Sequence, residues 1–199
     1  MSRSAGPLRT VAKATAGFLC GAAVWLLLAG PYHAAVAAPA QFLIRAVESP
    51  AVTSLRAQAS EVVVDRSDFP PASPRPGIPA SDLDFNIAIL SALFASAANP
   101  LSDRGILRFL LACFVLYVSH VAALVFGVES LYALDLGEWS RAHYGSFLRN
   151  FWATGVHFYR IALIFALPFA LWWALAADRP FSEGANESPA RAGRSRRRP

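Results

Sequence analysis

The chain has 199 residues, of which 55% are hydrophobic and only 16% are charged, whereas charged residues make up about 25% of an ordinary soluble domain. This composition excludes a disordered chain, a collagen-like repeat and a disulfide scaffold. The net charge of +5 suits either nucleic acid or a membrane surface, so the positions of the Arg residues must decide between them.

A basic N-terminus over residues 1–15 precedes the first apolar block, residues 16–38. A helix of this length rises about 35 Å, enough to cross about 30 Å of hydrocarbon. The basic start and the small residues at 35–37 are also typical of a cleaved secretory signal peptide. Because apolar residues continue through 42–44, we expect an uncleaved signal anchor.

Residues 39–84 are predicted to form a polar extracytoplasmic loop. The β-branched run between Glu61 and Asp65 predicts one short strand, either alone or paired in a hairpin with Val52–Ala59. Five prolines between positions 70 and 79 then predict a stiff, extended connector that joins neither a helix nor a central strand. About 40 residues are too few to bury a core of their own.

Three further apolar blocks follow, at 85–101, 106–128 and 151–177. The first of them is short and ends at Asn99-Pro100, so it is either a span or a re-entrant segment. A cytoplasmic turn over 102–105 is predicted to lead to the block at 106–128. Pro168 lies within the block at 151–177, where neighbouring groups in a bundle can satisfy the carbonyl that a proline leaves unbonded.

Residues 129–150 form the other predicted extracytoplasmic loop. Trp139 and Tyr144 within it are typical of a helix lying in the headgroup layer, although an ordinary exposed loop fits equally well. The Ser-, Gly-, Pro- and Arg-rich tail over 178–199 is predicted to be disordered.

Charge sets the orientation. With four spans, eleven basic residues fall on the side of the two termini, and six fall on the other side, diluted over longer loops. The positive-inside rule therefore predicts cytoplasmic termini and an even number of crossings. We expect an all-α integral membrane protein, a four-span helical bundle whose extracytoplasmic loops carry one short β element.

Basic residues in the tail are predicted to determine topology and to contact anionic lipid rather than nucleic acid; they are Arg194, Arg196, Arg197 and Arg198. The sequence contains no phosphate-binding Gly loop, Cys-x-x-Cys or metal-ligand motif, so it predicts no cofactor and no metal.

Ionisable residues inside spans are costly and mark candidate sites. His120, His157 and Arg160 are all predicted to lie about 9–13 Å below the outer edge of the bilayer. We therefore predict an interior polar cluster open to the outer face, with Glu129 or Asp84 as a counter-ion for Arg160. Its members are Asn86, Tyr117, His120, His157 and Arg160. The alternatives are that these groups only fix helix packing, or that Arg160 snorkels to the interface.

A catalytic pair is a weaker alternative, with Cys113 as nucleophile and His120 as base. These residues share a helix face but lie two turns, about 10 Å, apart, whereas a Cys–His pair must approach within about 3 Å.

Loose motifs along residues 15–177 resemble the exosortase H-associated membrane protein family: Trp25, Pro31-Tyr32, Asn86, Asn99-Pro100, His120, Phe151-Trp152 and Pro168 with Trp172. The resemblance implies an accessory protein of the bacterial inner membrane, encoded beside an exosortase that processes carboxyl-terminal sorting signals. An exosortase itself carries Cys, Arg and His near the outer face, and this chain has no Cys at that depth.

The sequence thus favours a non-enzymatic, multi-pass inner-membrane protein that binds an integral-membrane partner. The resemblance implies that this partner is an exosortase. The alternatives are a membrane-embedded Cys-dependent peptidase or transpeptidase, and a small transporter subunit.

Overall fold

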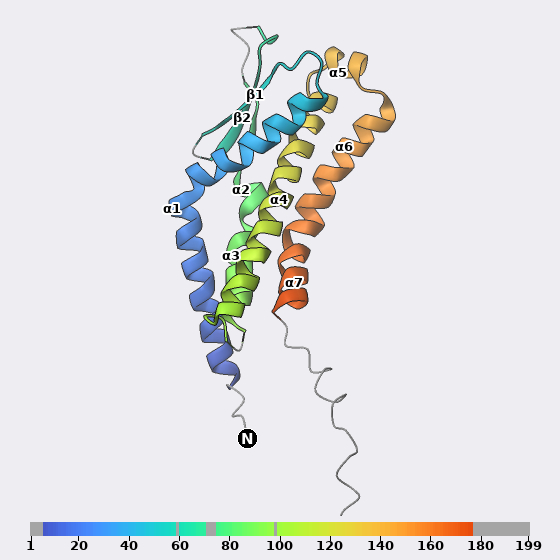
Figure 1. Cartoon of the computed structure of the whole chain (residues 1–199). Coiled ribbons are helices and arrows are strands. Elements are labelled where there is room, and N and C mark those ends of the chain that lie inside the picture. Colours follow the sequence, from blue (N-terminus) through green and yellow to red (C-terminus); the bar gives the residue numbers. More distant parts are fainter. Residues whose placement is uncertain (1–5, 59, 71–74, 98, 177–199) are drawn as a thin grey trace, which may run out of the picture.

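The computed structural model describes residues 6–58, 60–70, 75–97 and 99–176. Long helices run the length of the molecule, and a small sheet lies at the end opposite the N-terminus (Figure 1). The elements are α1 (Pro7–Val47), β1 (Thr53–Ala57), β2 (Glu61–Arg66), β3 (Gly77–Pro79), α2 (Ser81–Asp84), α3 (Asn86–Ala95), α4 (Asp103–Leu134), α5 (Glu138–His143), α6 (Ser146–Phe158), the π-helical turn η1 (Tyr159–Leu163) and α7 (Ile164–Leu175). The tail with its four predicted lipid-contacting Arg residues lies outside the described residues.

Within the described residues, three helical runs are long and apolar enough to cross a membrane: α1, α4 and the continuous run Ser146–Leu175. The predicted second span, 85–101, is not among them, because α3 has only 10 residues and rises about 15 Å, half the hydrocarbon thickness. The four-span prediction is therefore only partly confirmed. The two predicted extracytoplasmic loops, 39–84 and 129–150, are also shorter than expected, because α1 continues to Val47 and α4 to Leu134.

Helix α1 changes direction within its length (Figure 1). It contains Pro31, which removes one backbone hydrogen bond and clashes with the preceding turn, so it bends the helix. Residues 7–30 are mostly exposed apolar side chains, whereas the buried residues of the helix are mostly beyond the bend, including His33, Val36, Ala40 and Ile44. The bend therefore separates a largely exposed half, which packs on α3 along one face only, from a half that is mostly buried against protein.

The predicted hairpin is confirmed. Strands β1 and β2 pair antiparallel, with Leu55 opposite Val64, and β3 adds on the other side of β2. Because β3 is an edge strand ending at Pro79, this end of the proline-rich connector stays out of the centre of the sheet. Residues 71–74 of the connector lie outside the described residues. The exposed edge of β1 is covered, since the backbone N–H of Leu55 donates to Gln41 Oε1 of α1 at 2.7 Å.

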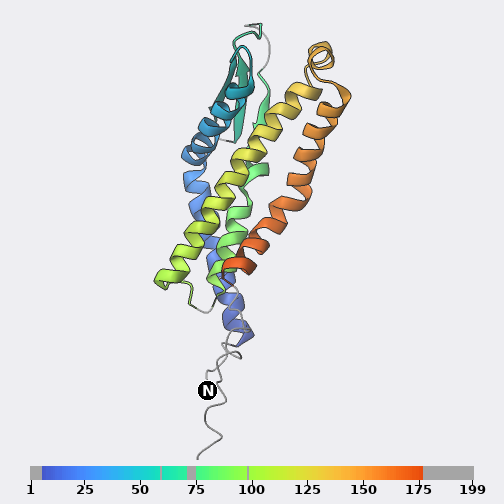
Figure 2. The same ribbon diagram turned by 45° about the vertical axis from the view of Figure 1, so that its right-hand side comes forward.

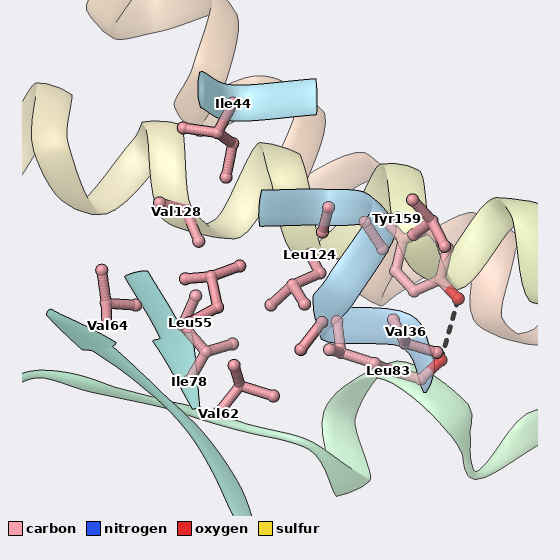
Figure 3. Close-up of a cluster of buried hydrophobic side chains, with 14 of the residues drawn as sticks. Val36, Ile44, Leu55, Val62, Val64, Ile78, Leu83, Leu124, Val128 and Tyr159 are labelled. Atoms are coloured by element: carbon pink, nitrogen blue, oxygen red, sulfur yellow. Dashed lines mark hydrogen bonds between the residues drawn. The ribbon is translucent and has the colours of Figure 1, made fainter. Parts of the chain in front are cut away.

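The sheet shares a core with the helices below it (Figure 3). Alternate residues of β2, Val62 and Val64, point inward with Ile78 and meet Ile44 of α1 and Val128 of α4. Burial of one such side chain contributes about 1.5–3 kcal/mol. The short β region is therefore stable because the upper ends of α1 and α4 complete its core.

Arg66 at the end of β2 joins four parts of this region. Its guanidinium donates to Glu48 Oε1, which follows α1, and to both carboxylate oxygens of Asp68, each at 2.9 Å. The same group stacks over Tyr132 of α4 and Trp139 of α5, 4.9 and 4.8 Å from the ring centroids. The hydrogen bond from Arg66 lowers the pKa of Asp68, so the pair contributes fully above about pH 4 and weakens as the pH falls below that value.

The loop between the third and fourth blocks forms a short helix, α5, after Gly137, whose φ of +63° permits the turn. Trp139 and Tyr144 pack against the sheet core, and Tyr144 donates to Glu129 Oε2 at 2.8 Å. These two aromatic residues thus contact protein, and their position in the headgroup layer stays a prediction. Glu129 accordingly bonds Tyr144 and is not the expected counter-ion of Arg160.

Small residues allow α1 and α3 to pack closely. Gly17 and Gly21 are four residues apart and face Ser91 and Ala95. A Cβ at Gly21 would lie 2.6 Å from Ser91 Cβ, and a Cβ at Gly17 would lie 2.4 Å from Ala95 Cβ. Such small-residue contacts are the usual basis of helix association in lipid, where the hydrophobic effect between helices is absent. The short α3 is therefore held against α1 by close backbone approach.

We expect Gly21→Leu to separate α1 from α3 and to lower stability by about 1–3 kcal/mol, because the new side chain overlaps Ser91. Gly30→Leu is the matched control on the same helix, since nothing lies within 4 Å of a Cβ placed there. Thermal unfolding in detergent, followed by tryptophan fluorescence, compares the two. Equal melting temperatures for the two variants would contradict the packing.

We expect Arg66→Met to lower the stability of the sheet region by about 3–5 kcal/mol, because Glu48 would lose its buried counter-ion. Arg56→Met, an exposed position on the neighbouring strand, should cost less than about 0.5 kcal/mol. Limited proteolysis between residues 50 and 80 measures opening of the sheet. Similar cleavage rates for both variants would show that Arg66 does not hold it.

Candidate functional site

A cluster of polar side chains, four of them buried, lies just beyond the bend of α1. The buried members are His33 from α1, Asp84 from α2, Asn86 from α3 and His120 from α4, and the half-buried Tyr32 of α1 joins them. His120 is 17 residues from the start of α4, which places it about 26 Å along that helix. Polar groups at this depth in a span need partners within the protein.

His120 is fully buried between two hydrogen-bonding partners. Its Nε2 lies 2.9 Å from Asn86 Oδ1, and its Nδ1 contacts the Tyr32 hydroxyl. An amide oxygen can only accept, so Nε2 carries the proton and Nδ1 accepts from Tyr32. This arrangement is a neutral imidazole that links α1, α3 and α4.

His33 and Asp84 form a second buried pair. His33 Nε2 and Asp84 Oδ2 are 2.7 Å apart, and the two side chains are only 5% and 2% exposed. The pair joins α1, just after Pro31, to the short helix α2. Because a buried carboxylate without a partner is very costly, this bond fixes the position of α2 relative to the bend.

Two tyrosine hydroxyls satisfy backbone carbonyls at the same level. Tyr159 donates to the carbonyl of Leu83 at 2.8 Å (Figure 3). Tyr117 donates to the carbonyl of Ala35 at 2.8 Å. Ala35 lies four residues before Pro39, which has no N–H to give it. Tyr117 therefore supplies the hydrogen bond that Pro39 removes from α1.

Several buried polar atoms around these pairs lack a hydrogen-bonding partner within the described residues. They are His33 Nδ1, Asp84 Oδ1, Asn86 Nδ2 and Trp25 Nε1, and the Trp25 indole lies beside Asp84. Native proteins rarely leave such groups unbonded. Donors and an acceptor gathered in this way are suited to hold ordered water.

The structure brings together part of the predicted cluster. Asn86 and His120 are bonded to each other, and Tyr117 is half-buried one turn from His120. His157 and Arg160 lie elsewhere, with exposed side chains, because the buried face of this helix carries Tyr159. Asp84 pairs with His33 and not with Arg160.

Sequence reasoning did not include Tyr32, His33 and Tyr159 in the cluster. The signal for the first two was available: a Pro, a Tyr and a His in succession interrupt an otherwise apolar helix. Tyr159 gave no such signal, since an aromatic residue beside His157 and Arg160 is ordinary in a span.

The described residues offer little for covalent or metal chemistry. Cys113 is half-buried among apolar side chains, while both His120 nitrogens are engaged by Tyr32 and Asn86. Among the described residues, no group of three or more His, Cys, Asp or Glu side chains could hold a metal ion. The site is chemically a network of hydrogen bonds that connects four helices.

Comparison of the chain with protein-family models, curated proteins and solved structures found no match.

We expect His120→Leu to destabilise the protein by about 2–4 kcal/mol, because the Tyr32 hydroxyl and the Asn86 amide would lose their buried partner. His157→Leu makes the same chemical change at an exposed position and should have little effect on stability. Thermal unfolding of both variants in detergent provides the measurement. A comparable loss for His157→Leu would place His157 in the interior network after all.

Proposed function

We propose that this chain is a non-enzymatic accessory protein that binds an integral-membrane partner, in an exosortase-type protein-sorting system of the bacterial inner membrane. The sorting system is suggested by the resemblance described above. The binding of a partner is supported by one exposed face of the run Ser146–Leu175.

That face combines positive charge with aromatic side chains. His157 and Arg160 are exposed on it, and Phe158, Ile161 and Phe165 beside them are 57%, 76% and 52% exposed. A partner helix that packs on this face would cover the exposed aromatic surface and give it specific neighbours in place of lipid.

The buried network supports an accessory role over catalysis. Its histidines hold helices together through Tyr32, Asn86 and Asp84, so neither is available as a general base. Cys113, the nucleophile of the alternative peptidase, bonds to neither histidine in the described structure. The network instead gives the partner a rigid outer region to recognise.

The path of the chain is compatible with cytoplasmic termini. Helix α3 returns toward the end of the molecule where α1 begins, α4 leaves from there, and α7 ends there (Figures 1 and 2). The chain therefore passes along the bundle four times although α3 is short. We propose that this end is cytoplasmic, in agreement with its excess of Arg, and that the sheet faces the periplasm.

A photo-crosslinking residue in place of Ile161 tests the partner face. When the protein is co-expressed with the exosortase encoded in the same genome, we expect a crosslinked product that contains the exosortase. The same residue at Leu27, which is 81% exposed on α1, should give none.

Equal crosslinking from positions 161 and 27 would argue against a specific face. A product at position 161 that contains another membrane protein in place of the exosortase would keep the partner-binding role and refute the sorting assignment.

A further inference from the structure

An apolar groove runs between the lower half of α1, α3 and the start of α4. Its volume is about 770 Å³, and its walls include Gly21 and Val24 of α1, Ile87 of α3 and Phe109 and Cys113 of α4. Figure 2 shows the lower end of α4 diverging from α1. The groove is lined almost entirely by carbon and is open at its side, toward the surroundings of the bundle.

A second hollow of about 190 Å³ extends the groove toward the bend of α1. It shares Val24, Ile87 and Cys113 with the groove and reaches Leu28 and Tyr32. From Lys13 to Leu28 the hollows follow 15 residues of helix, about 22 Å. One leaflet contributes about 15 Å of hydrocarbon, so the combined hollow is long enough for an acyl chain that enters from one membrane surface.

The lower end of the groove is positively charged. Lys13 is the only lysine of the chain, is half-buried in the groove wall, and lies with its Nζ 3.4 Å from the carbonyl of Ala97. That contact uses one of its three donors. Arg9 lies one turn before it on the same helix, so the end of the groove combines positive charge with unused hydrogen-bond donors.

The length and the charge of the combined hollow indicate its occupant. Its apolar walls and its length of more than one leaflet suit an extended hydrocarbon chain. The cationic end of the groove suits an anionic group at the membrane surface. An anionic phospholipid joins such a group to an acyl chain.

We propose that this groove binds one acyl chain of an anionic phospholipid, with the lipid phosphate on Lys13. The bound chain fills the space between α1 and α4 that the short α3 leaves open. This site is separate from the Arg residues of the tail, and it does not depend on the partner proposed above.

Native mass spectrometry of the full-length protein in detergent tests this site, with phosphatidylglycerol and phosphatidylcholine as probes. We expect one tightly retained phosphatidylglycerol and weaker retention of phosphatidylcholine. Lys13→Gln should weaken retention of phosphatidylglycerol about tenfold through loss of a charge-assisted contact. Val24→Trp should abolish it by filling the groove.

Two control variants match these changes. Arg141→Gln removes an exposed charge on α5, and Leu27→Trp adds the same bulk at an exposed position of α1 that does not line the groove. Both should retain lipid as the unmodified protein does. Melting temperatures of all variants show whether any loss of lipid comes from unfolding.

Cys113 provides a second readout because it lies in the groove wall. Saturation with phosphatidylglycerol should slow its reaction with a maleimide several-fold in a Cys20→Ala background, and Lys13→Gln should restore the rate.

Unchanged lipid retention in Lys13→Gln and Val24→Trp would overturn the site. Equal retention of the two phospholipids would overturn the role of Lys13 in headgroup recognition.

Discussion

The bend of α1 at Pro31 is the constraint on which the other parts of the structure depend. A straight helix of 41 residues would extend far beyond a bilayer and leave the short sheet without a covering helix. With the bend, residues 7–30 stay in the lipid-facing bundle while residues beyond it pack on β1 and β2. The same change of direction carries Tyr32 and His33 to the centre of the molecule.

The polar network follows from this bend and from the second proline. Each proline in α1 removes a backbone hydrogen bond, and Tyr117 replaces the one lost at Ala35. The pairs His33–Asp84 and His120–Asn86 then tie α1 to α2, α3 and α4. Buried polar pairs add little net stability, but their hydrogen bonds can form in only one arrangement of the helices. They therefore specify how the bundle assembles around a helix that is only 10 residues long.

Two exposed surfaces of the bundle differ in chemistry and support different proposals. The groove beside α3 is apolar with a cationic end, which suits a phospholipid. The face of Ser146–Leu175 carries exposed aromatic side chains part-way along the helix, which we propose as the surface for a protein partner. The Gly17 and Gly21 contacts shape the groove, because close packing of α3 on α1 leaves the start of α4 separated from α1.

The sequence by itself determined the apolar blocks, the strand at Glu61–Asp65 and the involvement of Asn86 and His120, because composition and local periodicity are properties of consecutive residues. It indicated a membrane protein and left the hairpin as one of two alternatives. It left open whether the block 85–101 spans or is re-entrant, because tertiary packing can override the helical preference of a short apolar run; in the structure α3 has only 10 residues. It also could not separate His157 and Arg160 from the interior, because depth along a helix is readable from spacing but rotation about its axis is set by packing. Only the tertiary structure, through the bend at Pro31 and the burial of Tyr159, decided which polar residues meet.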